Sequence, residues 1–295
     1  MRLSILDHGH RTRAKVFLTL TGTMSRMNSP DIVKMLLYRP QFLARPLLNI
    51  TVDTMRGPSY WTAGEREYLA MCTAQLLQCP FCVVTHAEVT RIASHGTLDP
   101  DDPASTRPEL RAVRDFLATL TSDHTPDDAD ASQVAGLPEQ AIRDALRVNL
   151  VFNIISRLAN AFGFSLREDE VHSGARSLHR FGYRFPGFLL ADDKPASNAS
   201  HNKTASDDVE NLRHSVLTAP ATTDAALRTA AARGGPLPEP WQSYAAMVRD
   251  ASYKITDTDI DRLTAAGYTE DQIFEVTVAA AVGAALRCFD TGLSL

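Results

Sequence analysis

Two cysteines and a histidine within eight residues form the most reactive group in the sequence: Cys79, Cys82 and His86. Pro80 follows the first cysteine, and proline is favoured at the first position of a helix, so we expect Cys79 at the N-cap and Cys82 one turn later on the same side. A disulfide between them is therefore geometrically possible. The free amides and the positive end of the helix dipole stabilise a thiolate there, which lowers a cysteine pKa from its usual value of about 8.5.

His86 lies four residues after Cys82, so its imidazole can approach that sulfur and take its proton, as the base of an activated nucleophile does. A histidine in this role needs a third group that fixes its orientation. The preceding predicted helix offers Glu65 and Glu67, but Glu65 forms a capping box with Thr62. Glu67 is the freer carboxylate, and an antiparallel helix pair would bring it over the cysteine helix.

This pattern carries a resemblance to a known family. Glu67, an eleven-residue gap, the run Cys79-Pro-Phe-Cys82 and then His86 resemble the E-x11-C-x-x-C-x-x-x-H signature of the alkylhydroperoxidase D (AhpD) family. That family belongs to the carboxymuconolactone decarboxylase-like superfamily, which is all-helical and oligomeric. A looser similarity to peroxidase-related members extends over three segments, Ile32 to Arg39, Trp61 to His86 and Phe152 to Phe164.

The resemblance implies an enzyme that reduces a small hydroperoxide. Cys82 would attack the peroxide oxygen and become a sulfenic acid, and Cys79 would condense with it to form a disulfide. His86 and Glu67 would relay the protons, and a thiol or a lipoyl-type protein reductant would restore the dithiol. No metal, haem or flavin is required. Phe81 stands where the best-known peroxidase members often have histidine, which predicts a shortened proton relay but leaves thiol–disulfide exchange possible.

Two other functions remain open. A non-redox enzyme of the same superfamily would transfer protons on a lactone or another small metabolite, although its members usually lack the cysteine pair. A helical assembly module would use long apolar helices such as Ile273 to Leu286 only as an interface. Structural zinc needs four ligands, and no second Cys-x-x-Cys accompanies this one, so we expect no metal site.

The composition limits the possible partners and location. Of the 295 residues, 44% are hydrophobic and 22% are charged, as in ordinary folded proteins, and the net charge of −5 argues against nucleic-acid binding. The longest apolar run, Val276 to Leu286, falls short of the roughly 20 residues that span a bilayer. The first residues lack the apolar region of a secretion signal. We therefore expect a cytoplasmic protein without membrane insertion, and the resemblance implies that it forms a homo-oligomer.

The elements that must position these residues are helices almost throughout, because apolar residues recur at spacings of three and four. No convincing sheet is predicted, so the expected fold class is all-α, and the resemblance implies an AhpD-like helical fold. Capping residues, prolines and glycines predict four helices around the motif, at Thr62–Gln78, Cys79–His95, Pro108–Leu120 and Leu137–Phe162. The polar side chains of Asn153 and Arg157 on the last of these either line the pocket or bridge two parts of the molecule.

The chain also contains an internal repeat. Seven residues recur 131 positions later: Thr125, Asp128, Asp130, Ala135, Gly136, Glu139 and Ile142 match Thr256, Asp259, Asp261, Ala266, Gly267, Glu270 and Ile273. We therefore expect two related helical halves, of which the second lacks the Cys-x-x-Cys. The predicted organisation is a catalytic domain at 1–191, a polar linker at 192–208 and a helical half-repeat at 209–295.

Overall fold

The structure is a computed structural model, which describes residues 1–25, 29–122, 132–166, 168–191 and 205–295. The described residues form helices and loops without a β-strand, so the expectation of an all-α fold is confirmed. The α-helices are α1 Ile5–His8, α2 Thr12–Ser25, α3 Asp31–Tyr38, α4 Ala44–Arg56, α5 Ala63–Leu76, α6 Pro80–Ala93, α7 Pro108–Thr121, α9 Glu139–Phe162, α10 Glu168–Phe181, α11 Gly187–Leu190, α12 Ala205–Arg213, α13 Ala225–Arg233, α14 Trp241–Ala251, α15 Asp257–Ala265 and α16 Glu270–Ser294. The short turns are η1 Pro103–Ser105, η2 His214–Thr218 and η3 Ser252–Lys254.

The four helices predicted around the motif correspond to α5, α6, α7 and α9, with ends within a few residues of the predicted ones. Thr62 caps α5 through the expected capping box, in which the Glu65 carboxylate accepts from the Thr62 amide at 2.8 Å. Gly163 ends α9 in the left-handed conformation, with φ of 65°, which glycine adopts without a steric penalty. Local capping chemistry thus sets the lengths of the helices that hold the motif.

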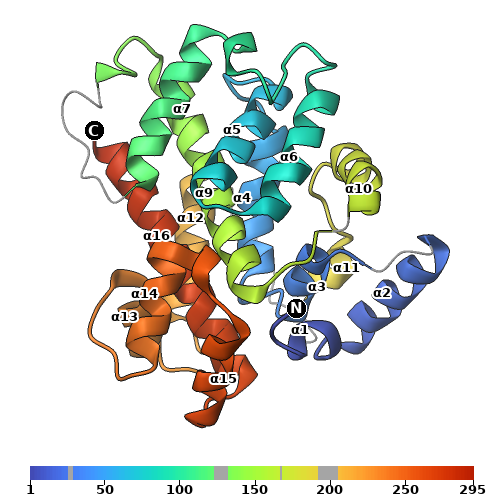
Figure 1. Cartoon of the computed structure of the whole chain (residues 1–295), viewed down its shortest axis with the longest axis vertical. Coiled ribbons are helices and arrows are strands. Elements are labelled where there is room, and N and C mark those ends of the chain that lie inside the picture. The colour runs from blue at the N-terminus through green and yellow to red at the C-terminus, as the bar shows by residue number, and fades with distance from the viewer. Residues whose placement is uncertain (26–28, 123–131, 167, 192–204) are drawn as a thin grey trace.

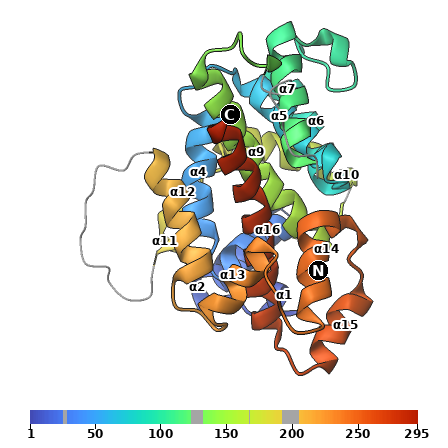
Figure 2. The same cartoon turned by 90° about the vertical axis from the view of Figure 1, so that its left-hand side faces the viewer.

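Two groups of helices are joined by two long helices, while α1, α2, α3 and α11 lie together beside them (Figures 1 and 2). α4, α5, α6 and α7 lie together at one end of the molecule, and α13, α14 and α15 lie at the other. α9 and α16 pack against each other and run between the two groups. α12 lies along α4, so the region after residue 204 packs directly on the first part of the chain.

One hydrophobic core extends through both groups, from Leu3 to Phe289, and includes the two motif cysteines. α16 supplies a large share of it, with a continuous buried surface from Ile273 to Val282. Among the described residues, only this helix is long and apolar enough to cross a membrane, but 83% of its apolar window is buried inside the molecule. α16 is therefore the central helix of the core.

Parts of the predicted organisation fall outside the described residues. Thr125, Asp128 and Asp130 of the first repeat copy lie in the undescribed segment 123–131, and the duplication stays a prediction. The predicted linker is undescribed up to residue 204, while 205–208 already belong to α12.

Asn153 and Arg157 bridge the two parts of the molecule. The Arg157 guanidinium donates to the Asn153 side chain and, at 2.9 Å, to the Arg249 carbonyl in α14. The Asn153 amide faces Cys288 Sγ in α16 at 3.9 Å. Neither residue lines either of the cavities described below. Of the two roles left open by the sequence, the structure therefore supports the bridge.

Candidate active site

Cys79 and Cys82 lie where the motif predicts, at the start of α6. Cys79 is the N-cap residue and Pro80 occupies the first helical position, so Cys82 follows one turn later. Both cysteines are free thiols, and each is only 1% exposed. Gln78 makes the sharp turn from α5 with a φ of 50°, which is uncommon outside glycine. The Asn160 side-chain amide of α9 holds this turn by donating to the Leu77 carbonyl at 2.9 Å.

His86 and Glu67 form a buried pair, because α5 and α6 pack side by side. His86 Nδ1 lies 2.8 Å from Glu67 Oε2, and Glu67 has no exposed surface. When Nδ1 donates to the carboxylate, Nε2 of a neutral imidazole becomes the proton acceptor. The structure thus brings all four residues of the motif onto the α5–α6 pair. Between His86 and Cys82 it shows no hydrogen bond among the described contacts.

Two residues that the sequence analysis missed also bind Glu67. Arg56 Nη2 donates to Oε1 at 2.6 Å, and the Tyr183 hydroxyl donates to both carboxylate oxygens, at 3.0 and 2.8 Å. The Arg56 guanidinium also lies over the Tyr183 ring, 5.0 Å from its centroid. Burial is the largest influence on Glu67 and raises its pKa, but His86 and Arg56 together outweigh it and hold the pKa below its usual range. The site therefore contains a stable carboxylate.

The electrostatic environments of the two thiols differ. The pKa of Cys79 is lowered, first by a hydrogen bond from the Cys82 thiol and then by the backbone amides of Cys82 and Phe81, which together exceed the effect of burial. The pKa of Cys82 is raised well above its usual value by the same hydrogen bond and by its complete burial. When the two thiols together lose one proton, the negative charge is therefore favoured on Cys79 over Cys82.

Ser156 of α9 is a third residue that the sequence analysis missed. It has no exposed surface, and its hydroxyl has no hydrogen-bond partner in the described part of the chain. The hydroxyl lies close enough to both sulfurs to lower the pKa of Cys79 and of Cys82. A buried donor without a partner is costly, so this hydroxyl is available to a sulfur that becomes negatively charged.

A cavity of about 710 Å³ reaches the dithiol from the α5–α6 turn. Cys79 lines it, whereas Cys82, His86 and Glu67 do not. Its wall is mostly apolar and includes Phe81 and Phe164, whose rings meet edge to face at 5.4 Å. The remaining lining residues are Arg2, Gln75, Gln78, Pro80, Val83, Val84, Ala159, Asn160, Gly163, Leu166 and Tyr253. The phenylalanine at position 81 therefore contributes to the shape of this cavity.

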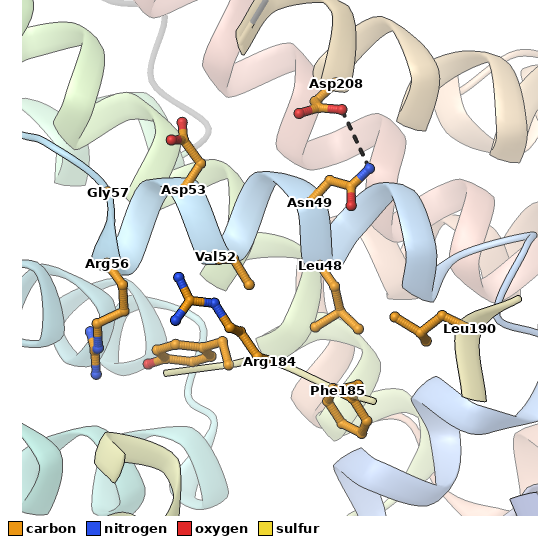
Figure 3. Close-up of a pocket in the computed structure, with 11 residues that line it drawn as sticks. Leu48, Asn49, Val52, Asp53, Arg56, Gly57, Arg184, Phe185, Leu190 and Asp208 are labelled. Carbon is orange, nitrogen blue, oxygen red and sulfur yellow. Dashed lines mark hydrogen bonds between the residues drawn. The ribbon is translucent and has the colours of Figure 1, made fainter. Parts of the chain in front are cut away.

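A second cavity, of about 500 Å³, lies beside α4 (Figure 3). Arg56 and Tyr183, the two donors to Glu67, belong to its lining, together with the apolar side chains of Leu48, Val52 and Phe185. The two cavities share no described lining residue. Cys79 and the two donors to Glu67 thus line different cavities.

The two other cysteines lie outside the motif. Cys288 is buried in α16, and Cys72 is partly buried in α5, where burial raises its pKa to about 11. Among the described residues, no group of three or more His, Cys, Asp or Glu side chains could hold a metal ion.

Among known proteins, similarity to this chain is found in solved structures but not in family models or curated sequences. No protein-family model matches the sequence, and no curated protein matches it. One similar structure is the alkylhydroperoxidase AhpD core of an uncharacterized peroxidase-related protein from Ralstonia eutropha, with 22% identity, 57% of this chain and 92% of that chain covered, and a TM-score of 0.46. Another is an uncharacterized peroxidase-related protein from Silicibacter sp., with 21% identity, coverage of 55% and 88%, and a TM-score of 0.45. The chain is thus similar to AhpD-like, peroxidase-related proteins at low identity and over little more than half its length.

Proposed function

We propose that this chain is a thiol-dependent peroxidase and disulfide oxidoreductase that cycles Cys79 and Cys82 between dithiol and disulfide. The observation that carries the proposal is the placement of the two free thiols: Cys79 caps α6, Cys82 lies in its first turn, and Cys79 lines a cavity of about 710 Å³. Two thiols at this spacing can deliver two electrons to a peroxide and end as a disulfide.

In the proposed reaction, one sulfur attacks the peroxide and becomes a sulfenic acid, and the other displaces water from it to form the disulfide. Glu67 holds the His86 imidazole through Nδ1, so that Nε2 can accept a thiol proton and return it to the departing oxygen. A small thiol or a lipoyl-type protein would restore the dithiol by two successive thiol–disulfide exchanges. These side chains suffice for the reaction without a metal, haem or flavin.

The test is consumption of cumene hydroperoxide with dihydrolipoamide as reductant. We expect turnover by the wild type and its loss in Cys79→Ser and in Cys82→Ser. Cys72→Ser is the matched control, because Cys72 lies in α5 away from the first turn of α6, and it should retain the wild-type rate. His86→Gln should lower the rate by about 100-fold, as the loss of a general acid–base group does.

Equal rates for the wild type and Cys82→Ser would contradict the proposal. Turnover of a non-peroxide metabolite that survives in the double variant Cys79→Ser/Cys82→Ser would favour the proton-transfer enzyme instead.

A further inference from the structure

We infer that Cys79, and not Cys82, is the sulfur that first reacts with a substrate in the cavity, and that Cys82 is the resolving thiol served by His86. This inference rests on the proposed function, and it reverses the order that the sequence motif implies.

The first argument is the position of each sulfur relative to the cavity. Cys79 lines the cavity together with Gln78 and Pro80, whereas Cys82 does not contribute to its wall. Both cysteines are 1% exposed, so membership of the lining, and not exposure, distinguishes them. Cys82 lies close enough to Tyr183 for a charge on its sulfur to raise the pKa of that phenol. Cys82 is therefore on the Glu67 side of the pair, and a molecule in the cavity approaches Cys79 before Cys82.

The second argument is the distribution of charge. The thiolate, and not the thiol, is the nucleophile. When the pair loses one proton, the charge stays on Cys79, because the Cys82 thiol donates a hydrogen bond to it and the amides at the start of α6 favour it. The cysteine that lines the cavity is thus also the one on which the negative charge is favoured.

The third argument is the place of the proton relay. His86 Nδ1 is bound to Glu67, and the ring lies one helical turn after Cys82 and two turns after the N-cap. A base so placed can take the proton of Cys82 more readily than that of Cys79. Since Cys82 has the raised pKa, it is the thiol that needs a base.

These positions give a balanced sequence of steps. The Cys79 thiolate attacks the distal oxygen of the hydroperoxide, an S–O bond forms, and the O–O bond breaks. The alkoxide takes up the proton that Cys79 had released to solvent in the cavity and leaves as an alcohol. His86 then accepts the Cys82 proton, the Cys82 sulfur attacks Cys79, the S–S bond forms, and the hydroxide leaves with that proton as water. One hydroperoxide and two thiols thus yield one alcohol, one water and one disulfide.

Reduction follows the same geometry in reverse. The thiolate of the reductant attacks the sulfur of Cys79, which is the one it reaches from the cavity, and forms a mixed disulfide with it. Cys82 leaves as a thiolate and takes up, through His86, the proton that the reductant thiol released when it ionised. A second thiolate of the reductant then releases Cys79.

The test traps the sulfenic acid in single-cysteine variants of the motif. Reduced Cys82→Ser and Cys79→Ser proteins receive one equivalent of cumene hydroperoxide in the presence of dimedone, and mass spectrometry of the peptides locates the adduct. We expect an adduct on Cys79 in Cys82→Ser, formed faster than any adduct on Cys82 in Cys79→Ser by about tenfold or more, the change in thiolate fraction for one pKa unit.

A second measurement uses the unaltered protein, so that a folding defect in a variant cannot decide the result. Reduced wild type is treated with less than one equivalent of iodoacetamide at neutral pH, and the label should be found mainly on Cys79. Preferential labelling of Cys82, or faster sulfenic acid formation there, would overturn the inference while leaving the proposed peroxidase intact. Preferential labelling of Cys79 without any consumption of peroxide would instead overturn the proposed function alone.

Discussion

Glu67 is an anion without contact with solvent, and its donors decide whether it can orient His86. Tyr183 supplies two of the contacts from a backbone with φ of 66°, which is rare for a bulky residue. Such a conformation costs on the order of 1–3 kcal/mol and persists only where the surroundings enforce it. The strain lies at a residue whose hydroxyl binds the relay carboxylate, so Tyr183 acts as a positioning residue.

Tyr183→Phe removes one donor to a charged group, which is worth about 1.5 kcal/mol or one pKa unit. The pKa of Glu67 in the folded protein is lowered from its usual value of 4.5. The ionised carboxylate is therefore fully present above pH 4.5, and it is lost as the pH falls through the pKa of the folded protein. Removal of the hydroxyl raises that folded value. We therefore expect the acid limb of the pH–rate profile of peroxide reduction to move to higher pH by about one unit.

The matched control for this change is Tyr60→Phe, because Tyr60 is 37% exposed and makes no contact with Glu67 among the described hydrogen bonds. An unchanged pH profile in Tyr183→Phe would show that its hydroxyl has no part in positioning the relay.

Ser156→Ala separates an effect on the thiols from an effect on stability. The Ser156 hydroxyl is buried and has no hydrogen-bond partner in the described residues, so its removal should leave the free energy of unfolding unchanged or slightly higher. Both thiol pKa values should rise, because the hydroxyl lowers each of them. Alkylation by iodoacetamide across pH and denaturant unfolding measure the two effects. Destabilisation with unchanged alkylation would contradict the assignment.

At the scale of elements, a buried ion network fastens α16 to the loop before α13. Glu275 has no exposed surface and accepts from the Thr222 and Thr223 amides, at 2.8 and 2.7 Å, and from Arg39. Arg228, also fully buried, donates to the carbonyls of this same loop. The loop would otherwise bury backbone groups without partners, so the network stabilises it.

Glu275→Gln should destabilise the fold by about 3 kcal/mol, since it leaves the buried Arg228 and the partly exposed Arg39 without their anion. Burial raises the pKa of Glu275, but the threonine and arginine donors together lower it, so its stabilisation is present above pH 4.5 and lost as pH falls through the folded value. Glu210→Gln is the control, because Glu210 is 67% exposed in its pair with Arg213. Urea unfolding at neutral and at acid pH tests the difference, and equal effects of both variants would argue against the network.

The contact of α13 with α16 depends on a glycine. A Cβ at Gly283 would lie 2.3 Å from the Ala232 carbonyl oxygen and 2.5 Å from its Cα, and neither backbone atom can move without the helix. Gly283→Ala should therefore destabilise by about 1–3 kcal/mol. A Cβ at Gly174 in α10 would meet no atom within 4 Å. Gly174→Ala should therefore raise the free energy of unfolding by up to about 1 kcal/mol through helix propensity. Thermal unfolding of both variants measures the contrast, and a tolerated Gly283→Ala would show that the two helices can separate freely.

At the scale of the whole molecule, much of the site could be predicted because it lies in one antiparallel helix pair. The spacing of Cys79, Cys82 and His86 within one helix, and of Glu67 in the helix before it, is a local pattern that helix geometry converts into proximity. Tyr183 approaches from 116 residues away through a backbone strain that no spacing reveals. Ser156 lies on a helix that is buried on nearly every side, where periodicity cannot single out one face.

Unfolding should be a single cooperative transition. The regions 1–191 and 209–295 share one hydrophobic core, and α9 and α16 bury their apolar surfaces against each other. Neither region can keep its core without the other, as two-state unfolding requires. Calorimetry of the whole chain should show one peak, and fragment 1–191 expressed alone should remain partly unfolded. Two separate peaks would instead support independent domains.

Asn160 links the region without the Cys-x-x-Cys to the candidate site. Its one amide nitrogen reaches both the Leu77 carbonyl, just before the dithiol, and the Ser252 hydroxyl at 3.2 Å in η3. Tyr253, the next residue, forms part of the wall around Cys79. η3, which has no cysteine, thus supports the wall of the cavity beside Cys79. Natural variation at positions 252 and 253 would change which molecules can enter this cavity.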